Sequence, residues 1–354
     1  MNDKKVILIT NTLGNGGAQR VQVELINQWV QNGVHVIVLQ TENRDQYNYW
    51  VDDRVEILNI HTSNNRLLRY GLELKQICAL MNRYPEATVL AFVIHSIFLV
   101  SLCSFFTKNR IVLSERNDPD RWPKSALRRY LRDLSFVTAD HCVFQSEGAR
   151  QHFNKRIQHK ASIIPNPINP YLPQINKGKR EDVVITASRL ERQKNLPMMI
   201  RAFAQFSKYY PNYILEVYGR GDDEKELQAL IQELSLENKA FLKGYSHNIY
   251  AEMNRCSIFA LSSNFEGLSN SMLEAMAMGL PCVVTDCPPG GAKEVINNNV
   301  NGILVPVGDI NAMSDAFCKI ANDKTFASKL SSEAAKVREE YPIEEIAKKW
   351  LAII

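Results

Sequence analysis

The fold is decided by a strand–loop–helix unit, and residues 183–197, VVITASRLERQKNLP, are its clearest example. Val183–Ala187 is a short apolar run rich in β-branched residues, which favours a buried strand. Pro197 stands where proline is favoured, in the first turn of a helix. The polar loop between them holds Arg189 and Lys194, so we expect both cations at the carboxyl end of the strand, where α/β sheets bind ligands.

The same unit recurs along the whole chain. Further strands are expected at Val6–Ile9, His35–Leu39, Val55–Leu58, Val89–Phe92, Ile111–Leu113, His141–Phe144, Ser162–Ile164, Tyr213–Val217, Ala240–Leu242, Ile258–Leu261, Cys282–Thr285 and Ile303–Val305. Helices are expected at Ala18–Asn32, Arg66–Asn82, Ile97–Phe106, Lys124–Val137, Glu147–Lys155, Pro197–Tyr209, Lys225–Leu234, Ile249–Arg255, Ser271–Met278, Ala312–Asn322 and Ala327–Glu340. Buried strands joined by helices predict an α/β fold with parallel, doubly wound sheets.

The domain organisation follows from length and from one proline-rich break. A chain of 354 residues exceeds the size at which a single core usually divides. Three prolines between Pro165 and Pro170 end any regular element there. The sequence therefore predicts two Rossmann-like domains, 1–167 and 168–340, facing each other across a ligand cleft at the carboxyl ends of their strands.

Composition excludes several protein classes. The seven cysteines form no C-x-x-C pair, which argues against a disulfide framework or a zinc site and fits reduced thiols in a cytoplasmic protein. The start, Met1–Val6, lacks the apolar core of a signal peptide. Val89–Phe106 holds eighteen residues without Lys, Arg, Asp or Glu, near the lower limit for a membrane span. Because it contains a histidine and three serines within the alternating pattern, we favour a buried strand and a core helix.

Charge is unevenly distributed along the chain. Residues 1–170 hold 21 Lys/Arg and 15 Asp/Glu, whereas residues 171–354 hold 21 and 23. The basic first half indicates an anionic partner or surface. Within it, the stretch from Trp122 to Arg132 is basic and amphipathic, with Trp122 and Tyr130 as aromatic anchors, and such helices can lie on anionic membranes. An ordinary surface helix is the alternative, and no nucleic-acid partner is expected.

Two carboxylates eight positions apart occupy the stretch NFEGLSNSMLEAMAMG, residues 264–279. Glu266 lies in a Gly/Ser/Asn loop, and Glu274 lies in a helix that Gly279 ends. Carboxylates accept hydrogen bonds from sugar and ribose hydroxyls, and the N–H groups at a helix start can receive a phosphate. Arg189 and Lys194 suit a diphosphate, because the guanidinium of Arg189 can bind two phosphate oxygens at once and the ammonium of Lys194 is a compact positive charge. Taken one at a time, each of these charges could instead be a solvated surface group.

A glycine-rich loop follows the first strand. Asn11–Gln19 contains Gly14, Gly16 and Gly17 but has Gln19 where a dinucleotide fingerprint needs its third glycine. With Glu42 after the second strand, a nicotinamide enzyme stays an alternative. The glycines also allow backbone N–H groups to approach a phosphate or sugar closely.

Five motifs together carry a family resemblance. They are Gly16-Gly17-Ala18, Pro165-Asn166-Pro167, Arg189 with Lys194-Asn195, Tyr218-Gly219-x-Gly221, and Glu266-Gly267 followed by Leu273-Glu274-Ala275-Met276 and Gly279-x-Pro281. Over essentially the whole chain, the sequence resembles glycosyltransferases of family 4, which have the two-domain GT-B fold. The pair of glutamates separated by seven residues is the most specific of these marks.

The resemblance implies a role for each matched residue. Arg189 and Lys194 would bind the diphosphate of a nucleotide sugar, for which UDP is the expected nucleotide, and Glu266 would hold hydroxyls of the transferred sugar. Glu274 would accept from the ribose. The remaining nucleotide-sugar contacts would come from Gly16, Gly17, Gly219, Gly267, Leu268, Ser269 and Asn270. Such enzymes retain the anomeric configuration and need no metal or other cofactor, and the segment 341–354 would cross back onto the first domain.

One departure concerns the acceptor side. Where family members often have a histidine after the strand Ile111–Leu113, this chain has Ser114-Glu115-Arg116-Asn117, so Glu115 and Arg116 are the acceptor-side candidates. This stretch resembles a subset that transfers hexoses or N-acetylhexosamines during surface-glycan assembly, often onto lipid-linked acceptors. A cytoplasmic enzyme at the inner face of the membrane is therefore expected. A protein that binds nucleotide sugars without turnover is the alternative.

A D-x-D motif at Asp118-Pro119-Asp120 needs separate weighing, because this motif binds metal in a different glycosyltransferase fold. The proline between the aspartates favours a turn after the preceding strand. We therefore predict a turn and no metal site.

Overall fold

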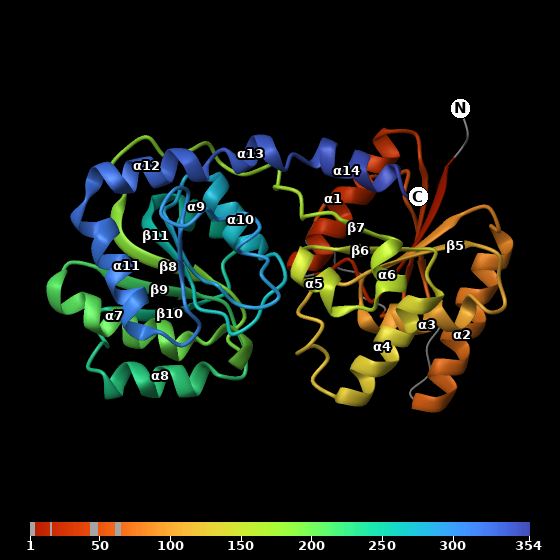
Figure 1. Ribbon diagram of the computed structural model, residues 1–354, viewed down its shortest axis with the longest axis horizontal. Coiled ribbons are helices and arrows are strands. Elements are labelled where there is room, and N and C mark those ends of the chain that lie inside the picture. The colour runs from red at the N-terminus through yellow and green to blue at the C-terminus, as the bar shows by residue number, and fades with distance from the viewer. Residues whose placement is uncertain (1–3, 15, 43–48, 61–64) are drawn as a thin grey trace. The chain divides into compact units, whose positions relative to one another are not determined.

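The chain divides into two units, shown in Figure 1. The computed structural model describes residues 4–14, 16–42, 49–60 and 65–354. Unit 1 runs to Pro167 and also includes Ile343–Ile354, and unit 2 is Ile168–Pro342. Each unit is built around one parallel sheet with helical crossovers, so the predicted α/β, doubly wound fold class is confirmed.

Within the described residues, unit 1 has a seven-stranded sheet in the order β3-β2-β1-β4-β5-β6-β7. The strands are β1 (Lys5–Thr10), β2 (His35–Gln40), β3 (Glu56–Asn59), β4 (Thr88–Ala91), β5 (Arg110–Ser114), β6 (His141–Phe144) and β7 (Ala161–Ile163). The helices are α1 (Gly17–Gln31), α2 (Arg66–Arg83), α3 (Ile94–Cys103), α4 (Ala126–Thr138), α5 (Glu147–His152), α6 (Lys155–His159) and α14 (Ile343–Leu351). The strand order reverses between β1 and β4.

Apolar side chains on both faces explain why these strands are central. Ile7 of β1 stands beside Ile37 of β2 and Val89 of β4, and all three are buried. Continuous apolar runs of this kind are typical of strands covered on both sides by helices. The core of unit 1 therefore spans the sheet.

The last helix of the chain belongs to unit 1. The ring of Trp350 in α14 lies 6.3 Å from that of Trp29 in α1 and 5.1 Å from that of Phe92. Lys4 Nζ donates to the backbone oxygens of Leu351, at 2.6 Å, and Ile354, at 3.0 Å. Buried aromatic packing and capped carbonyls thus hold α14 against α1.

Unit 2 has a six-stranded sheet in the order β10-β9-β8-β11-β12-β13. The strands are β8 (Glu181–Ala187), β9 (Ile214–Tyr218), β10 (Ala240–Gly244), β11 (Cys256–Leu261), β12 (Cys282–Thr285) and β13 (Ile303–Val305). The helices are η1 (Arg192–Lys194, a 3-10 turn), α7 (Leu196–Tyr209), α8 (Glu224–Glu233), α9 (Ile249–Arg255), α10 (Asn270–Ala277), α11 (Ile310–Asn322), α12 (Lys324–Ala334) and α13 (Val337–Glu340). Here the order reverses between β8 and β11.

Three expected helices have different boundaries. The helix expected at Ile97–Phe106 is α3, which begins three residues earlier, at Ile94. Its N-cap residue, Val93, makes no side-chain capping bond, so the sequence carried no signal for this start. The helix expected at Glu147–Lys155 is two short helices, since Asn154 caps a new one by accepting from Ile157 N at 3.1 Å. The helix expected at Ala327–Glu340 is α12 followed by α13.

The apolar stretch 89–106 forms β4, a short turn and α3 with the residues that follow it. In the described part of the chain, every helix is too short or too polar to cross a bilayer.

Candidate functional site

The strand order of unit 2 brings two charged loops together. β8 and β11 are neighbours and the order reverses between them, so the loops that follow them meet at the carboxyl ends of the strands. Arg189 and Lys194 follow β8, and Glu266 follows β11. Ligands of doubly wound sheets bind at such a position, so unit 2 places its predicted charges where a ligand is expected.

Hydrogen bonds between the two loops fix their geometry. Asn264 N donates to Gln193 O at 2.8 Å, and Asn195 Nδ2 donates to Asn264 Oδ1 at 3.1 Å. Ser262 Oγ donates to Lys194 O at 2.8 Å. Asn195 adopts a left-handed conformation, with φ of 46°, which asparagine tolerates better than most residues. The two loops are thereby held as one structure.

Lys194 and Glu266 form an ion pair at the centre of this structure. Their side chains are 10% and 19% exposed, so the pair is largely shielded but open to a ligand. Ser263 Oγ donates to the same carboxylate oxygen at 3.3 Å, and Glu266 N donates to Pro288 O at 2.9 Å. One cation and one carboxylate that sequence predicted separately thus stand in direct contact.

Arg189 is more open than Lys194. Its side chain is 60% exposed, and its NH1 donates to Glu191 Oε1 at 2.9 Å. Such an exposed pair contributes little to stability and breaks readily. A ligand phosphate can therefore recruit Arg189 at little cost.

Glu274 lies one helix turn inside α10. It is buried, and Tyr250 Oη donates to its Oε1 at 3.3 Å. Ser269 caps α10 by accepting from Met272 N at 3.4 Å, so Asn270 is the first helical residue. The loop that contains Gly267 also lies close to the segment that follows β12, because a Cβ added at Gly291 would lie only 2.2 Å from Gly267 O. Leu268 is buried in the core next to this contact.

Gly219 has a packing role in the structure. Its φ is 140°, and a Cβ there would lie 1.8 Å from Ser188 O. Ser188 N donates to Tyr218 O at 3.0 Å, and Leu190 N donates to Arg220 O at 3.0 Å. The β9–α8 loop thus lies backbone to backbone against the loop that carries Arg189. Its predicted part in nucleotide-sugar binding stays a prediction.

Gly16 and Gly17 open α1 in unit 1. Gly16 has φ of 133° and stands at the N-cap position, where Arg20 N donates to its oxygen at 3.0 Å. A Cβ at Gly16 would meet Gln19 Oε1 at 2.5 Å, so the residue that breaks the dinucleotide fingerprint occupies this space. Asn15 of this motif lies outside the described residues.

Glu115 in unit 1 is buried, and its carboxylate is occupied by neighbours. Its Oε1 accepts from Arg116 N at 3.0 Å and Asn117 N at 3.1 Å, and its Oε2 accepts from Arg132 NH1 at 3.2 Å. Burial raises the pKa of Glu115, and the Arg132 guanidinium opposes that shift. These contacts give Glu115 a structural role, and its part in acceptor binding stays a prediction.

Arg116 is held at the carboxyl end of β5. Its NH2 donates to Asn166 Oδ1, and its guanidinium stands 5.6 Å from the centre of the Phe92 ring. Burial lowers the pKa of Arg116 to about 10, so it keeps its charge at neutral pH. A permanent cation in this position can bind an anionic or hydroxyl-rich group but cannot shuttle a proton.

The two aspartates of the D-x-D motif have separate surroundings. Asp118 is buried and accepts from Asp120 N at 2.9 Å, which closes a turn, and burial raises the pKa of Asp118. Asp120 is exposed and contacts His152 Nδ1 at 2.7 Å. Across the described residues, no group of three His, Cys, Asp or Glu side chains could hold a metal ion.

Sequence reasoning gave no supporting role to the polar groups that contact the charged ones. Tyr250 comes from α9, and Asn195, Ser263 and Asn264 come from the two loops of unit 2. The signal for the loop residues was present, because polar side chains cluster directly after β11. Nothing in the sequence near Tyr250 pointed to Glu274.

Family models match almost the whole chain. Glycosyl transferases group 1 matches residues 169–337, and Glycosyltransferase Family 4 matches residues 15–171. A relative from Campylobacter jejuni, the N-acetylgalactosamine-N,N'-diacetylbacillosaminyl-diphospho-undecaprenol 4-alpha-N-acetylgalactosaminyltransferase, is 27% identical over 98% of this chain and 99% of its own. A second C. jejuni relative, the GalNAc-alpha-(1->4)-GalNAc-alpha-(1->3)-diNAcBac-PP-undecaprenol alpha-1,4-N-acetyl-D-galactosaminyltransferase, is 22% identical over 99% of this chain and 98% of its own.

The fold is that of solved GT-B structures. Anabaena HepE in complex with UDP superposes with a TM-score of 0.80 at 18% identity, over 98% of both chains. The protein is therefore a glycosyltransferase with the GT-B architecture. It belongs to glycosyltransferase family 4, as the sequence motifs indicated. The nicotinamide alternative is set aside by this membership.

Proposed function

We propose that this glycosyltransferase moves a hexose or N-acetylhexosamine from a UDP-linked donor onto a glycan acceptor, with retention and without a metal. The observation that carries the proposal is the Lys194–Glu266 pair at the switch point of unit 2, which is the place between β8 and β11 where the strand order reverses. Arg189 lies on the same loop as Lys194. The names of the C. jejuni relatives and the UDP bound to HepE support the substrate classes. Lipid-linked glycans are the acceptor class we favour.

Two cations carry the leaving-group chemistry in this proposal. Lys194 and Arg189 bind the donor diphosphate and stabilise the negative charge that grows on it as the sugar departs, which is the task of a divalent ion in metal-dependent transferases. Lys194 is already placed and shielded by Glu266, so it needs little reorganisation. In many enzymes, preorganised charge of this kind lowers the activation barrier more than any other effect.

The sugar is held beside the diphosphate. Glu266 accepts from hydroxyls of the transferred sugar through the lone pairs that Lys194 and Ser263 leave available. The bond from the anomeric carbon to the phosphate oxygen breaks, and a bond to the acceptor oxygen forms on the same face. The acceptor's proton passes to the departing phosphate oxygen.

Glu274 anchors the nucleotide by accepting from the ribose hydroxyls, and Tyr250 orients it. Carboxylates accept hydrogen bonds from such hydroxyls, and the burial of Glu274 strengthens them. In unit 1, Arg116 is proposed to form part of the acceptor side, and Glu115 is proposed to position it by accepting from Arg116 N. We further propose that the enzyme works in surface-glycan assembly on the cytoplasmic side of a membrane.

The test is a donor screen followed by an assay of donor hydrolysis. Purified protein is first tested for thermal stabilisation by a panel of nucleotide sugars and then for donor hydrolysis with the ones that bind. Stabilisation by UDP-linked sugars, with hydrolysis that survives EDTA, supports the proposal. Stabilisation by another nucleotide class, or complete loss with EDTA and rescue by Mn²⁺, would contradict it.

Arg116 keeps a second candidate function open, that of a nucleotide-sugar-binding protein without turnover. It is a permanent cation in a place where family members often have a histidine. Product formation decides between the two. Tight donor binding with no transferred sugar or hydrolysed donor would favour the binding protein.

A further inference from the structure

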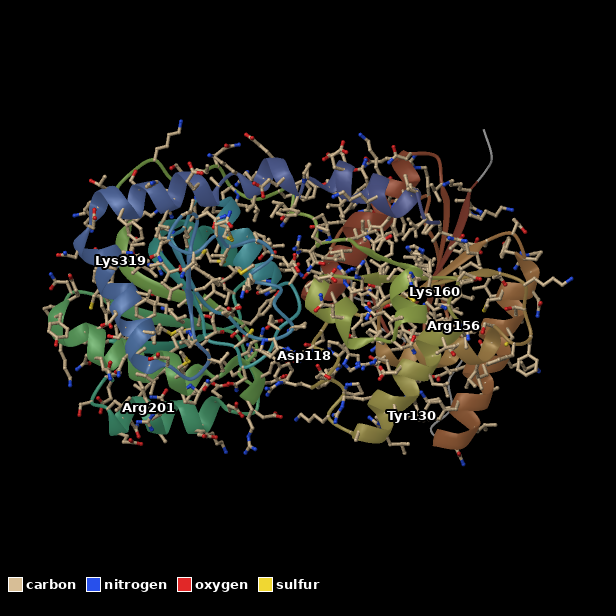
Figure 2. The ribbon with its side chains drawn as sticks, in the orientation of Figure 1. Asp118, Tyr130, Arg156, Lys160, Arg201 and Lys319 are labelled. Carbon is tan, nitrogen blue, oxygen red and sulfur yellow. The ribbon has the colours of Figure 1, made fainter. Side chains whose placement is uncertain are left out.

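An exposed apolar stripe runs along the outer face of α4 in unit 1. Leu127, Tyr130, Leu131 and Leu134 recur at helical spacing and are between 42% and 66% exposed. Figure 2 labels Tyr130 on this helix. The opposite face of α4 already packs into the core through Phe136. The exposed stripe is therefore not needed to attach α4 to the sheet.

The stripe continues onto the end of α3. Leu102, Phe105 and Phe106 are between 50% and 76% exposed. A groove of about 760 Å³ joins the two elements, with Leu102 and Phe105 on one side and Leu131 and Leu134 on the other. We call these seven residues the α3/α4 patch. A continuous exposed apolar surface of this kind marks an interaction site.

Basic side chains flank the α3/α4 patch. Lys108 follows Phe106, and Lys124 and Arg128 stand at the start of α4; all three are exposed. Within the described part of the chain, no ion pair involves these three residues. Arg132 differs, because it is fully buried against Glu115 and Asp133, so the part of the sequence prediction that used Arg132 at a membrane surface is wrong. Trp122 is also only half-exposed and precedes the helix.

We propose that the α3/α4 patch docks onto an anionic lipid bilayer. Phe105, Phe106 and Leu127 enter the boundary between headgroups and acyl chains, and Tyr130 lies at the headgroup level. Lys108, Lys124 and Arg128 face the anionic headgroups. The inference goes beyond the proposed transfer reaction and does not depend on it.

Charge favours a bilayer over a second copy of the chain. In a symmetric dimer the same surface contacts itself, so a single interface would contain the basic side chains of both copies, Lys124 and Arg128 among them. Like charges at an interface oppose association. An anionic surface instead complements the basic residues and the apolar stripe at the same time.

Vesicle flotation with the full chain tests the docking. The wild type should bind vesicles containing about 30% phosphatidylglycerol and should bind pure phosphatidylcholine vesicles at least about tenfold more weakly. The double variant Phe105→Ser/Phe106→Ser should lose at least about tenfold in partitioning to the anionic vesicles. Its matched control is Tyr171→Ser/Tyr209→Ser, which changes two aromatics in unit 2 that are 79% and 77% exposed and should bind as the wild type does.

A charge-reversal pair tests the electrostatic half of the proposal. Lys124→Glu/Arg128→Glu should remove the preference for anionic vesicles, whereas Lys208→Glu/Lys225→Glu, on the exposed surface of unit 2, should leave it. Failure of the wild type to float, equal binding to neutral vesicles, or equal losses in the control variants would overturn the proposal. A concentration-dependent dimer that disappears in Phe105→Ser/Phe106→Ser would assign the patch to a second copy. Donor hydrolysis in solution, measured on the same variants, should be unchanged and keeps this test separate from that of the proposed function.

Discussion

Two ion pairs, one in each unit, follow strands of similar sheets and have opposite characters. In unit 1, Glu115 pairs with Arg132 where both side chains are at most 5% exposed, and backbone N–H groups occupy the other carboxylate oxygen. In unit 2, Lys194 and Glu266 are 10% and 19% exposed and belong to the loops at the point where the strand order reverses. The first pair is sealed by its partners, whereas the second can share its charges with a ligand.

We infer from the difference that the Glu115–Arg132 pair is structural and that the Lys194–Glu266 pair is available to a ligand. A buried pair costs desolvation free energy, which is recovered only when every donor and acceptor is matched, as at Glu115. A partly open pair holds its members in position until a ligand replaces one contact. We therefore expect substitutions at the Glu115–Arg132 pair to change stability and those at the Lys194–Glu266 pair to change binding and turnover.

The largest effect is expected at the sealed pair. Glu115→Ala removes one of the two carboxylates that pair with the buried Arg132 guanidinium and leaves the backbone N–H groups of Arg116 and Asn117 without their acceptor, which costs about 3 kcal/mol or more of unfolding free energy. The Tm of unit 1 should fall by at least about 6 °C in calorimetry. Glu86→Ala, which breaks the exposed pair with Lys5, should change the Tm by less than about 2 °C. Equal Tm values for both variants would show that the Glu115–Arg132 pair is not structural.

The open pair should respond in activity. Arg189→Ala or Lys194→Ala should lower kcat/KM by at least about a hundredfold, because each contact strengthens as charge develops on the leaving diphosphate. Arg201→Ala on α7 is the matched control, since Arg201 makes an exposed pair with Glu233 at 3.5 Å, and it should be neutral. Near-normal turnover in both site variants would refute the diphosphate assignment. The Tm of Arg189→Ala should stay within about 2 °C of the wild type.

A smaller effect is expected at the support of the ribose contact. Tyr250→Phe removes the hydroxyl that donates to Glu274, and the loss of one hydrogen bond costs about 0.5–1.5 kcal/mol. UDP should bind about two- to tenfold more weakly by calorimetry. An analogue without ribose hydroxyls should bind the variant and the wild type equally. If both ligands weaken together, Tyr250 supports the loop in general and not the ribose contact.

The smallest effect is a pH dependence in unit 1. A hydrogen bond with Asp133 raises the pKa of His152 above its usual 6.5, helped by the charge of Asp120 and opposed by burial and by Arg132. The stabilisation from charged His152 is therefore full below about pH 6.5 and is lost as the pH rises through the raised pKa. His152→Gln should make the Tm depend less on pH between about pH 6 and 8, by an amount that corresponds to less than about 1 kcal/mol of unfolding free energy. The control His159→Gln, at an exposed position, should leave the pH profile of the Tm as it is in the wild type. An unchanged pH profile in His152→Gln would show that this network does not set the pH dependence.

The sequence predicted the fold class because strands such as β1 and β8 are apolar on both faces and the loops after them are polar. It did not predict the start of α3, because Val93 offers no capping side chain to mark a helix that begins three residues before the expected Ile97. Arg132 looked like a surface cation because helical spacing alone does not show that a salt bridge turns it inward.

The sequence placed the candidate charges after their strands but did not show which of them are in contact. Lys194 and Glu266 are 72 positions apart, and sequence could place each after a strand but could not show that β8 and β11 are neighbours. Tyr250 stayed hidden because it reaches Glu274 from a helix that bears no motif. Pairing between distant elements depends on strand order, which local patterns do not encode.

Titration of UDP into two glutamine variants tests the central claim most directly, namely that the switch-point loops of unit 2 bind a nucleotide diphosphate with separate roles for the two carboxylates. Glu274→Gln should weaken UDP binding by about tenfold or more, because a buried acceptor for the ribose is lost. Glu266→Gln should leave UDP affinity intact or raise it, because Lys194 is freed for the phosphates, while kcat for transfer falls about tenfold or more. Equal loss of UDP affinity in both variants, or no change in either affinity or kcat, would contradict the claim.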